Sequence, residues 1–135
     1  MLRASAADDA TIVAAGVTVV EALRAADELE RKKRRVRVID AYSVKPIDSE
    51  TLIQAMEETG LLVVVEDHWI EGGLGDAVLS ALAHAPTLSG RVVKLAVGAM
   101  PGSGTPEELR EWAGISARAI MERIDGELTL RAERA

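Results

Sequence analysis

The chain has 135 residues, 48% of them hydrophobic, with three aromatic side chains and no cysteine, and its formal net charge is −6. This length corresponds to one domain, and so high an aliphatic content excludes a disordered chain. The acidic charge and the few aromatics argue against nucleic-acid binding, and the missing cysteines exclude disulfides and thiolate sites. No apolar run reaches the roughly 20 residues of a membrane span, so we expect a cytoplasmic protein that binds neither membranes nor nucleic acids.

The first predicted strand covers residues 11–15 and is followed by Gly16 and a helix with a regular apolar face. We expect the side chain of Thr18 to cap this helix. The basic run at 31–35 lies at the end of the same helix. Cations at that end complement the helix dipole and the run holds no aromatic, so a solvated helix end is favoured over a nuclear signal or nucleic-acid patch.

The second predicted strand covers residues 36–40, and the helix after it begins with Asp48 as its N-cap and ends at Gly60. The third strand, 61–65, is a continuous run of leucine and valine. Such a run is typical of a parallel strand that is buried on both faces.

The third predicted helix begins in the segment Gly72-Gly-Leu-Gly75 and is closed by Pro86. A fourth strand, 92–97, then leads into the loop 98–104, which holds too many glycines and prolines to be regular.

Two short helices, 106–112 and 116–124, are predicted to complete a single domain over residues 1–126. The polar residues 127–135 are expected to form a frayed tail. Alternating strands and helices predict an α/β fold, a three-layer α/β/α sandwich around a mostly parallel sheet.

Ligands of such sheets bind beyond the carboxyl ends of the strands. There, Glu66, Asp67 and His68 could supply a general base or a metal ligand, or else form an orienting network at a domain interface. Consecutive side chains point to different sides, and no histidine or cysteine spacing supports a metal site. We therefore expect no metal site, and the residues show no complete catalytic set, because no nucleophile is paired with a base.

The glycines of segment 72–75 could leave backbone N–H groups free to cradle a phosphate, and close strand–helix packing explains them equally well. Tyr42 and Trp69 follow strand ends, where we predict a docking face. The candidate crevice or interface residues, which share a place at this edge, are Gly16, Thr18, Tyr42, Glu66, Asp67, His68, Trp69, Gly72, Gly73 and Gly75.

Residues 65–78 read Val-Glu-Asp-His-Trp-Ile-Glu-Gly-Gly-Leu-Gly-Asp-Ala-Val. This segment resembles the C-terminal domain of transketolases, particularly their animal-type and split bacterial forms. Three further stretches resemble the family in order and spacing, at 11–18, 38–48 and 101–109. Within the last stretch, Gly102 and Thr105 stand where relatives often carry arginine and lysine. An anion contact that this loop makes in relatives is therefore not expected in this chain.

The resemblance implies a thiamine-diphosphate-dependent enzyme that transfers a two-carbon ketol unit between sugar phosphates. It also implies a five-stranded mixed sheet whose short antiparallel first strand would be residues 2–4. Thiamine diphosphate and a divalent cation would be held by other domains or subunits of the same enzyme, which would be the partners of this chain. The full enzyme would be a homodimer, and this chain alone would bind no cofactor and be inactive.

Two alternatives remain open at this point. The crevice between segments 16–18, 66–68 and 72–75 could belong to a small-molecule sensor. The chain could also be the related C-terminal domain of a 2-oxoacid dehydrogenase β subunit or of a deoxyxylulose-phosphate synthase. Those domains usually lack the Asp-His pair after Val-Glu, which favours the transketolase resemblance.

Overall fold

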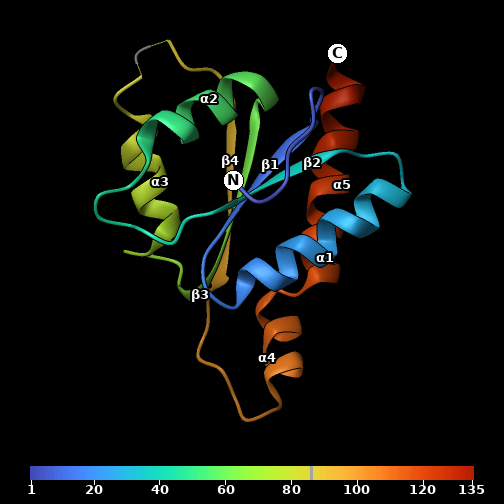
Figure 1. Ribbon diagram of the computed structural model, residues 1–135. Helices are drawn as coiled ribbons and strands as arrows, with labels where there is room; N and C mark the ends of the chain where they lie inside the picture. Colours follow the sequence, from blue (N-terminus) through green and yellow to red (C-terminus); the bar gives the residue numbers. More distant parts are fainter. Residues whose placement is uncertain (86) are drawn as a thin grey trace.

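The computed structural model describes residues 1–85 and 87–135 (Figure 1). The predicted helix end at Pro86 lies outside the described residues. The elements in chain order are β1 (Ala10–Ala14), α1 (Thr18–Arg31), β2 (Val36–Asp40), α2 (Ser49–Thr59), β3 (Leu61–Trp69), α3 (Leu74–Leu82), β4 (Arg91–Val97), α4 (Pro106–Ala113) and α5 (Ala117–Arg134).

The four strands form one parallel sheet in the order β2-β1-β3-β4. The N-terminal segment adds an antiparallel bridge, in which the Leu2 N–H donates to the Val38 carbonyl at 2.8 Å and the Val38 N–H to the Arg3 carbonyl at 2.9 Å. The fifth, antiparallel strand expected from the resemblance is therefore reduced to one bridge beside β2.

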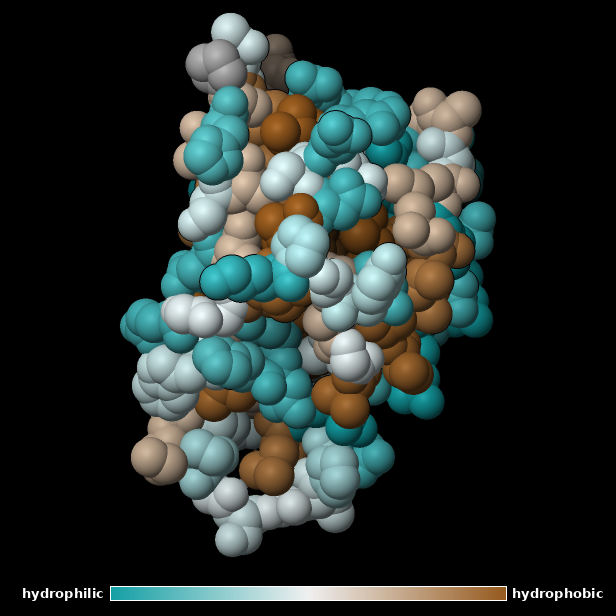
Figure 2. Space-filling view, turned by 60° about the vertical axis from the view of Figure 1, so that its left-hand side comes forward, coloured by the Kyte–Doolittle hydropathy of each residue, from teal (hydrophilic) through white to brown (hydrophobic). Residues whose placement is uncertain are grey.

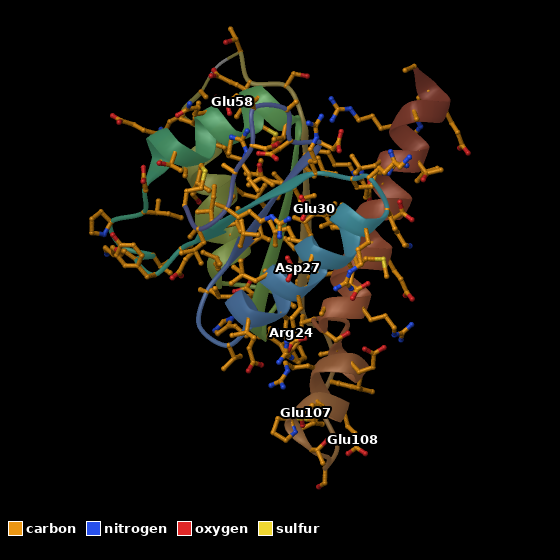
Figure 3. All side chains as sticks on the ribbon, turned by 45° about the vertical axis from the view of Figure 1, so that its right-hand side comes forward. Arg24, Asp27, Glu30, Glu58, Glu107 and Glu108 are labelled. Atoms are coloured by element: carbon orange, nitrogen blue, oxygen red, sulfur yellow. The ribbon has the colours of Figure 1, made fainter. Side chains whose placement is uncertain are left out.

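Arg3 also ties the N-terminal segment to α1. Its guanidinium lies 2.6 Å from an Asp27 oxygen and 2.7 Å from a Glu30 oxygen, and these two carboxylates lie on the same side of α1 (Figure 3). This ion-pair cluster explains why so short a segment stays beside the edge of the sheet.

Helices α1 and α5 cover one face of the sheet, and α2 and α3 cover the other (Figure 1). On the first face Ile12 and Val63 are fully buried, and on the second Val13 and Leu62 are. The two central strands, β1 and β3, are thus buried on both faces. The continuous apolar run of 61–65 predicted this for β3. The predicted three-layer α/β/α sandwich is confirmed, and its core is aliphatic.

Both predicted ends of α2 are correct, whereas the predicted N-cap of α1 is not. Asp48 caps α2 by accepting the Thr51 N–H, and Gly60 ends α2 in the left-handed conformation. The prediction that Thr18 caps α1 is wrong, because Val17 holds the N-cap position without a side-chain bond. The Thr18 hydroxyl lies instead 2.9 Å from the Val65 carbonyl oxygen, where it joins the start of α1 to β3.

Strand β3 is longer than predicted and carries the residues 66–69 as well. Its pairing with β4 is irregular between Val65 and Trp69, which marks a bulge in this part of the strand. Glu66, Asp67 and His68 consequently belong to the strand itself rather than to a loop after it.

The expected end of the last helix near Ile124 is wrong, as is the frayed tail at 127–135, because α5 continues to Arg134. Leu128 is buried against the core of the α1 face. The Arg131 guanidinium donates to the Thr59 carbonyl at 2.6 Å, and a cation suits the C-terminal end of α2. These two contacts hold a segment that is otherwise polar.

The basic run at 31–35 is a solvated helix end, as predicted, and several of its side chains also pair with carboxylates of the domain. Arg31 pairs with Glu28, and both Lys32 and Arg34 lie 3.4 Å from carboxylate oxygens of Asp125. None of the helices in the described part of the chain is long and apolar enough to cross a bilayer.

Candidate functional site

The carboxyl ends of the four parallel strands lie at the same end of the sheet. The loop 98–105 and α4 project beyond this end (Figure 1). A hollow of about 530 Å³ opens there. It is lined by the loops after β1 and β2, the end of β3 and the start of α3, namely by Ala15, Gly16, Val17, Val44, Glu66, Asp67, His68, Gly72, Gly73 and Leu74. The structure thus brings together residues of all three predicted segments and adds Ala15 and Val44, which the sequence reasoning missed.

The remaining candidates lie around this hollow rather than in it. Tyr42 borders a neighbouring hollow beside residues 46–48, and Trp69 ends β3. Thr18 is buried, and Gly75 lies under the side chain of Lys94. These residues therefore shape or flank the crevice without lining it.

The floor of the crevice is the carboxylate of Glu66, a residue that is 4% exposed. One oxygen accepts the Leu74 N–H at 2.5 Å and the other accepts the Gly75 N–H at 3.1 Å. These are backbone donors of the first turn of α3, which the helix itself leaves unbonded. Glu66 therefore caps α3 from the neighbouring strand, and its negative charge lies at the positive end of the helix.

Gly73 makes this cap possible. A Cβ at position 73 would lie 2.0 Å from a carboxylate oxygen of Glu66 and 2.7 Å from the His68 Nδ1. The backbone before α3 can approach the carboxylate only where no side chain intervenes. A phosphate would need the same N–H groups that Glu66 occupies, so the geometry favours close strand–helix packing as the reason for the glycines.

Asp67 and His68 are both exposed. Alternation along the strand places Asp67 on the opposite side from Glu66, whereas His68 lies on the same side as Glu66. The His68 Nδ1 lies 2.7 Å from the Trp69 carbonyl oxygen and 3.9 Å from a Glu66 oxygen. Among residues 1–85 and 87–135 no group of three or more histidine, aspartate or glutamate side chains could hold a metal ion. Glu66 therefore caps α3, and the exposed Asp67 and His68 form part of the rim of the crevice.

A second polar contact closes the other side of the α3 start. Gly72 has φ +78°, a conformation that glycine adopts without strain, and its N–H donates to Asp76 at 2.5 Å. Lys94 of β4 donates to the other Asp76 oxygen at 2.7 Å, while its stem packs over Gly75. The hydrogen bonds from Lys94 and then Gly72 hold the pKa of Asp76 below its ordinary value.

Lys94→Met is expected to raise the pKa of Asp76 toward its ordinary value, because the larger of the two stabilising bonds to the carboxylate is lost. In the wild type this carboxylate adds stability above its unfolded-state pKa, and the contribution disappears as the pH falls through the lower folded-state pKa. A carboxyl-detected NMR titration of both proteins measures the shift. Asp67, which lies outside this contact, serves as the internal control, and an unchanged Asp76 titration would contradict the assignment.

Several large apolar side chains are exposed around the crevice. Tyr42 is 90% exposed, Met100 84% and Trp69 44%. Val17 and Val44 are about half exposed on the wall of the hollow itself. Figure 2 shows hydrophobic groups among hydrophilic ones on one side of the molecule, with a hollowed lower end. An apolar rim on a domain of this charge indicates a surface that another protein part can cover.

The loop 98–105 ends in a rigid helix start. Thr105 accepts the Glu108 N–H at 3.2 Å, and the Glu108 carboxylate accepts the Thr105 N–H at 2.8 Å, which together form a capping box. Glu107 and Glu108 lie in the first turn of α4 at the end of the molecule (Figure 3). Thr105 therefore has a structural role in this chain, where many relatives were expected to carry a lysine.

Comparison with known proteins identifies close relatives. The profile of the family described as "Transketolase, C-terminal domain" matches residues 1–120. Transketolase-like protein 2 of Mus musculus is 45% identical over 125 residues, which are 92% of this chain and 20% of the relative. Transketolase of Homo sapiens is 41% identical over 123 residues, 90% of this chain and 19% of the relative. The chain thus spans about a fifth of the length of these relatives.

Solved structures agree. A split-gene transketolase, described as an inactive beta4 tetramer, superimposes with a TM-score of 0.82 at 40% identity, over 91% of this chain and 40% of the other. Transketolase of Campylobacter jejuni gives a TM-score of 0.63 at 17% identity, over 92% of this chain and 18% of the other, and so supports the fold alone. The resemblance predicted from residues 65–78 is confirmed.

Proposed function

This chain belongs to the transketolase C-terminal domain family, and we propose that it is the structural and assembly domain of a transketolase. The complete enzyme would transfer a two-carbon ketol unit between sugar phosphates. The match over residues 1–120 carries this proposal, and it favours a transketolase over the sensor and over the related dehydrogenase and synthase domains.

The exposed apolar side chains at the strand ends would be the contact with the catalytic part of the enzyme. We define the docking face as Val17, Tyr42, Val44, Trp69 and Met100. All five are large, apolar and about half exposed or more. Met1 borders the same hollow as Tyr42, so a domain joined to the N-terminal end would enter beside this face.

The cofactor and its cation would be bound outside this chain. The only buried carboxylate of the crevice among the described residues, Glu66, is already bonded to two backbone N–H groups. No metal-ligand group exists in the described part of the chain, and the helix N-terminus beside the crevice is capped. These residues do not fit thiamine diphosphate or its cation, so no step of ketol transfer is assigned to them.

The partners would be the thiamine-diphosphate-binding domains or subunits of the same enzyme, in a homodimer located in the cytoplasm. The tetramer described for the split-gene relative supports assembly through a part of the enzyme that is related to this chain. In this arrangement the domain contributes stability and geometry to the enzyme rather than a reacting group.

We expect the isolated chain to show no ketol transfer when supplied with thiamine diphosphate, Mg²⁺, a ketose phosphate and an aldose phosphate. It should instead bind the polypeptide that holds the cofactor-binding domains of the same enzyme. Trp69→Ser should weaken this binding about thirty-fold, since an aromatic anchor at an interface commonly contributes about 2 kcal/mol. Calorimetric titration measures the affinity.

Leu130→Ser is the matched control. Leu130 is 48% exposed and lies on α5, near the amino ends of β3 and β4 and so at the opposite end of the strands from the docking face. It should leave the binding unchanged. Turnover by the isolated chain would contradict the assignment of the chemistry to other domains. Equal losses for Trp69→Ser and Leu130→Ser would contradict the position of the docking face.

A further inference from the structure

The two edges of the sheet are protected very differently. Strand β2 forms one edge and β4 the other (Figure 1). At β2, the N-terminal segment occupies the edge through the antiparallel bridge between Arg3 and Val38. Strand β4 has β3 on one side, and the described residues place no strand on its other side.

The pairing of β4 shows which of its backbone groups face outward. The Arg91 N–H donates to the Gly60 carbonyl, and the Val97 carbonyl accepts the Ile70 N–H, so the odd-numbered residues face β3. In a parallel strand the N–H and C=O of one residue point to the same side, and successive residues alternate. Three N–H and three C=O groups, those of Val92, Lys94 and Ala96, therefore point outward. None of them has a protein partner within residues 1–85 and 87–135.

The usual protections of an edge strand are weak here. Natural edges carry proline, outward bulges or free lysines that prevent pairing with another strand. The seven residues of β4 include no proline. Its one lysine, Lys94, is withdrawn, since its stem packs over Gly75 and its ammonium is bonded to Asp76. The outer side of β4 is thus free of the features that usually prevent pairing with a further strand.

We propose that β4 pairs with β4 of a second copy of this chain, antiparallel and centred on Lys94, to give one continuous eight-stranded sheet. This inference does not rest on the proposed enzyme. Centring on Lys94 places Val92 opposite Ala96 of the second copy and Ala96 opposite its Val92. All three outward residues of each copy then form hydrogen-bonded pairs, whereas every shifted register leaves at least one of them unpaired.

The side chains are compatible with this register. On the α5 face, Val93 lies opposite Leu95 of the second copy, an aliphatic pair of the kind that stabilises antiparallel sheets. On the α3 face the two Lys94 side chains are opposed, and each is already bonded to an Asp76 carboxylate. The four alternating charges limit the repulsion that two free lysines would cause.

Sedimentation equilibrium of the isolated chain over a wide concentration range tests the proposal, because an interface this small is weak. We expect a monomer–dimer equilibrium. Val92→Pro removes an outward N–H without removing a bond to β3, and it should weaken the dimer at least ten-fold. Val92→Thr, which keeps the N–H and the β-branched shape, should leave the equilibrium unchanged. A purely monomeric wild type would overturn the proposal.

The register is tested by distance. The chain holds no cysteine, so Arg91→Cys gives one spin label per copy. In the proposed register the two label positions are six residues apart along the sheet, about 20 Å. A pulsed-EPR distance near this value is the expected result, and a dimer with another distance would overturn the pairing. Circular dichroism and thermal unfolding of Val92→Pro show whether the monomer is intact. If it is unfolded, the distance measurement decides alone.

Discussion

Glu66→Ala is expected to lower the free energy of unfolding by about 3 kcal/mol, measured by urea denaturation at neutral pH. The loss of the carboxylate leaves two backbone N–H groups, those of Leu74 and Gly75, without a partner in a buried place. It also removes a negative charge from the positive end of α3, whose N-cap Gly73 supplies no side-chain bond.

Glu66→Gln tests whether the stability comes from the volume of the Glu66 side chain or from its two hydrogen bonds to backbone N–H groups. The amide keeps the volume of the carboxylate, but its NH₂ group would face one of the two backbone donors, so most of the loss should remain. Asp67→Ala is the matched control, because Asp67 is an exposed carboxylate next in the strand, and it should change the stability by less than about 0.5 kcal/mol. Full stability of Glu66→Gln would show that packing, not the two hydrogen bonds, is the function of Glu66.

The sequence identified the crevice but not the partner of its central carboxylate. The apolar run of 61–65 and the glycines of 72–75 predicted a buried strand followed by a helix, and both are correct. That Glu66 reaches the N–H groups eight and nine positions later depends on how strand and helix pack. Glu21 shows the same limit, since it accepts the Ala117 N–H at 2.8 Å from 96 positions away. Local patterns carry no signal for such caps.

The predicted end of the C-terminal helix is wrong for a different reason. Gly126 and the polar residues after it suggested an end, and the bond between Arg131 and Thr59 joins segments 72 positions apart. One local signal could have corrected this. Ile120, Ile124 and Leu128 recur every four residues, which is the spacing of one helical face, and all three are buried.

A buried ion pair joins the N-terminal segment to β2. Arg37 is 5% exposed, and its Nε lies 3.2 Å from an Asp8 oxygen, while the side chain of Asp8 is 2% exposed. Asp8 also accepts the N–H and the hydroxyl of Ser5. A second contact joins the Arg37 guanidinium to Glu58 at the end of α2. The hydrogen bond from Arg37, followed by that from Gln54, holds the pKa of Glu58 below its ordinary value.

Arg37→Met is expected to destabilise the domain by about 3 kcal/mol at neutral pH, because it leaves the Asp8 carboxylate buried without its cation. Asp8→Ala combined with Arg37→Met should recover most of this loss, since a buried pair replaced by apolar groups often costs little. Urea denaturation of both singles and the double gives the coupling energy. The Glu58 contribution exists above its unfolded-state pKa and fades as the pH falls through the lower folded-state value, so Arg37→Met should also flatten this acid-side dependence. Additive single losses would show that Arg37 acts through its aliphatic stem, because an ion pair must produce coupling that depends on both partners.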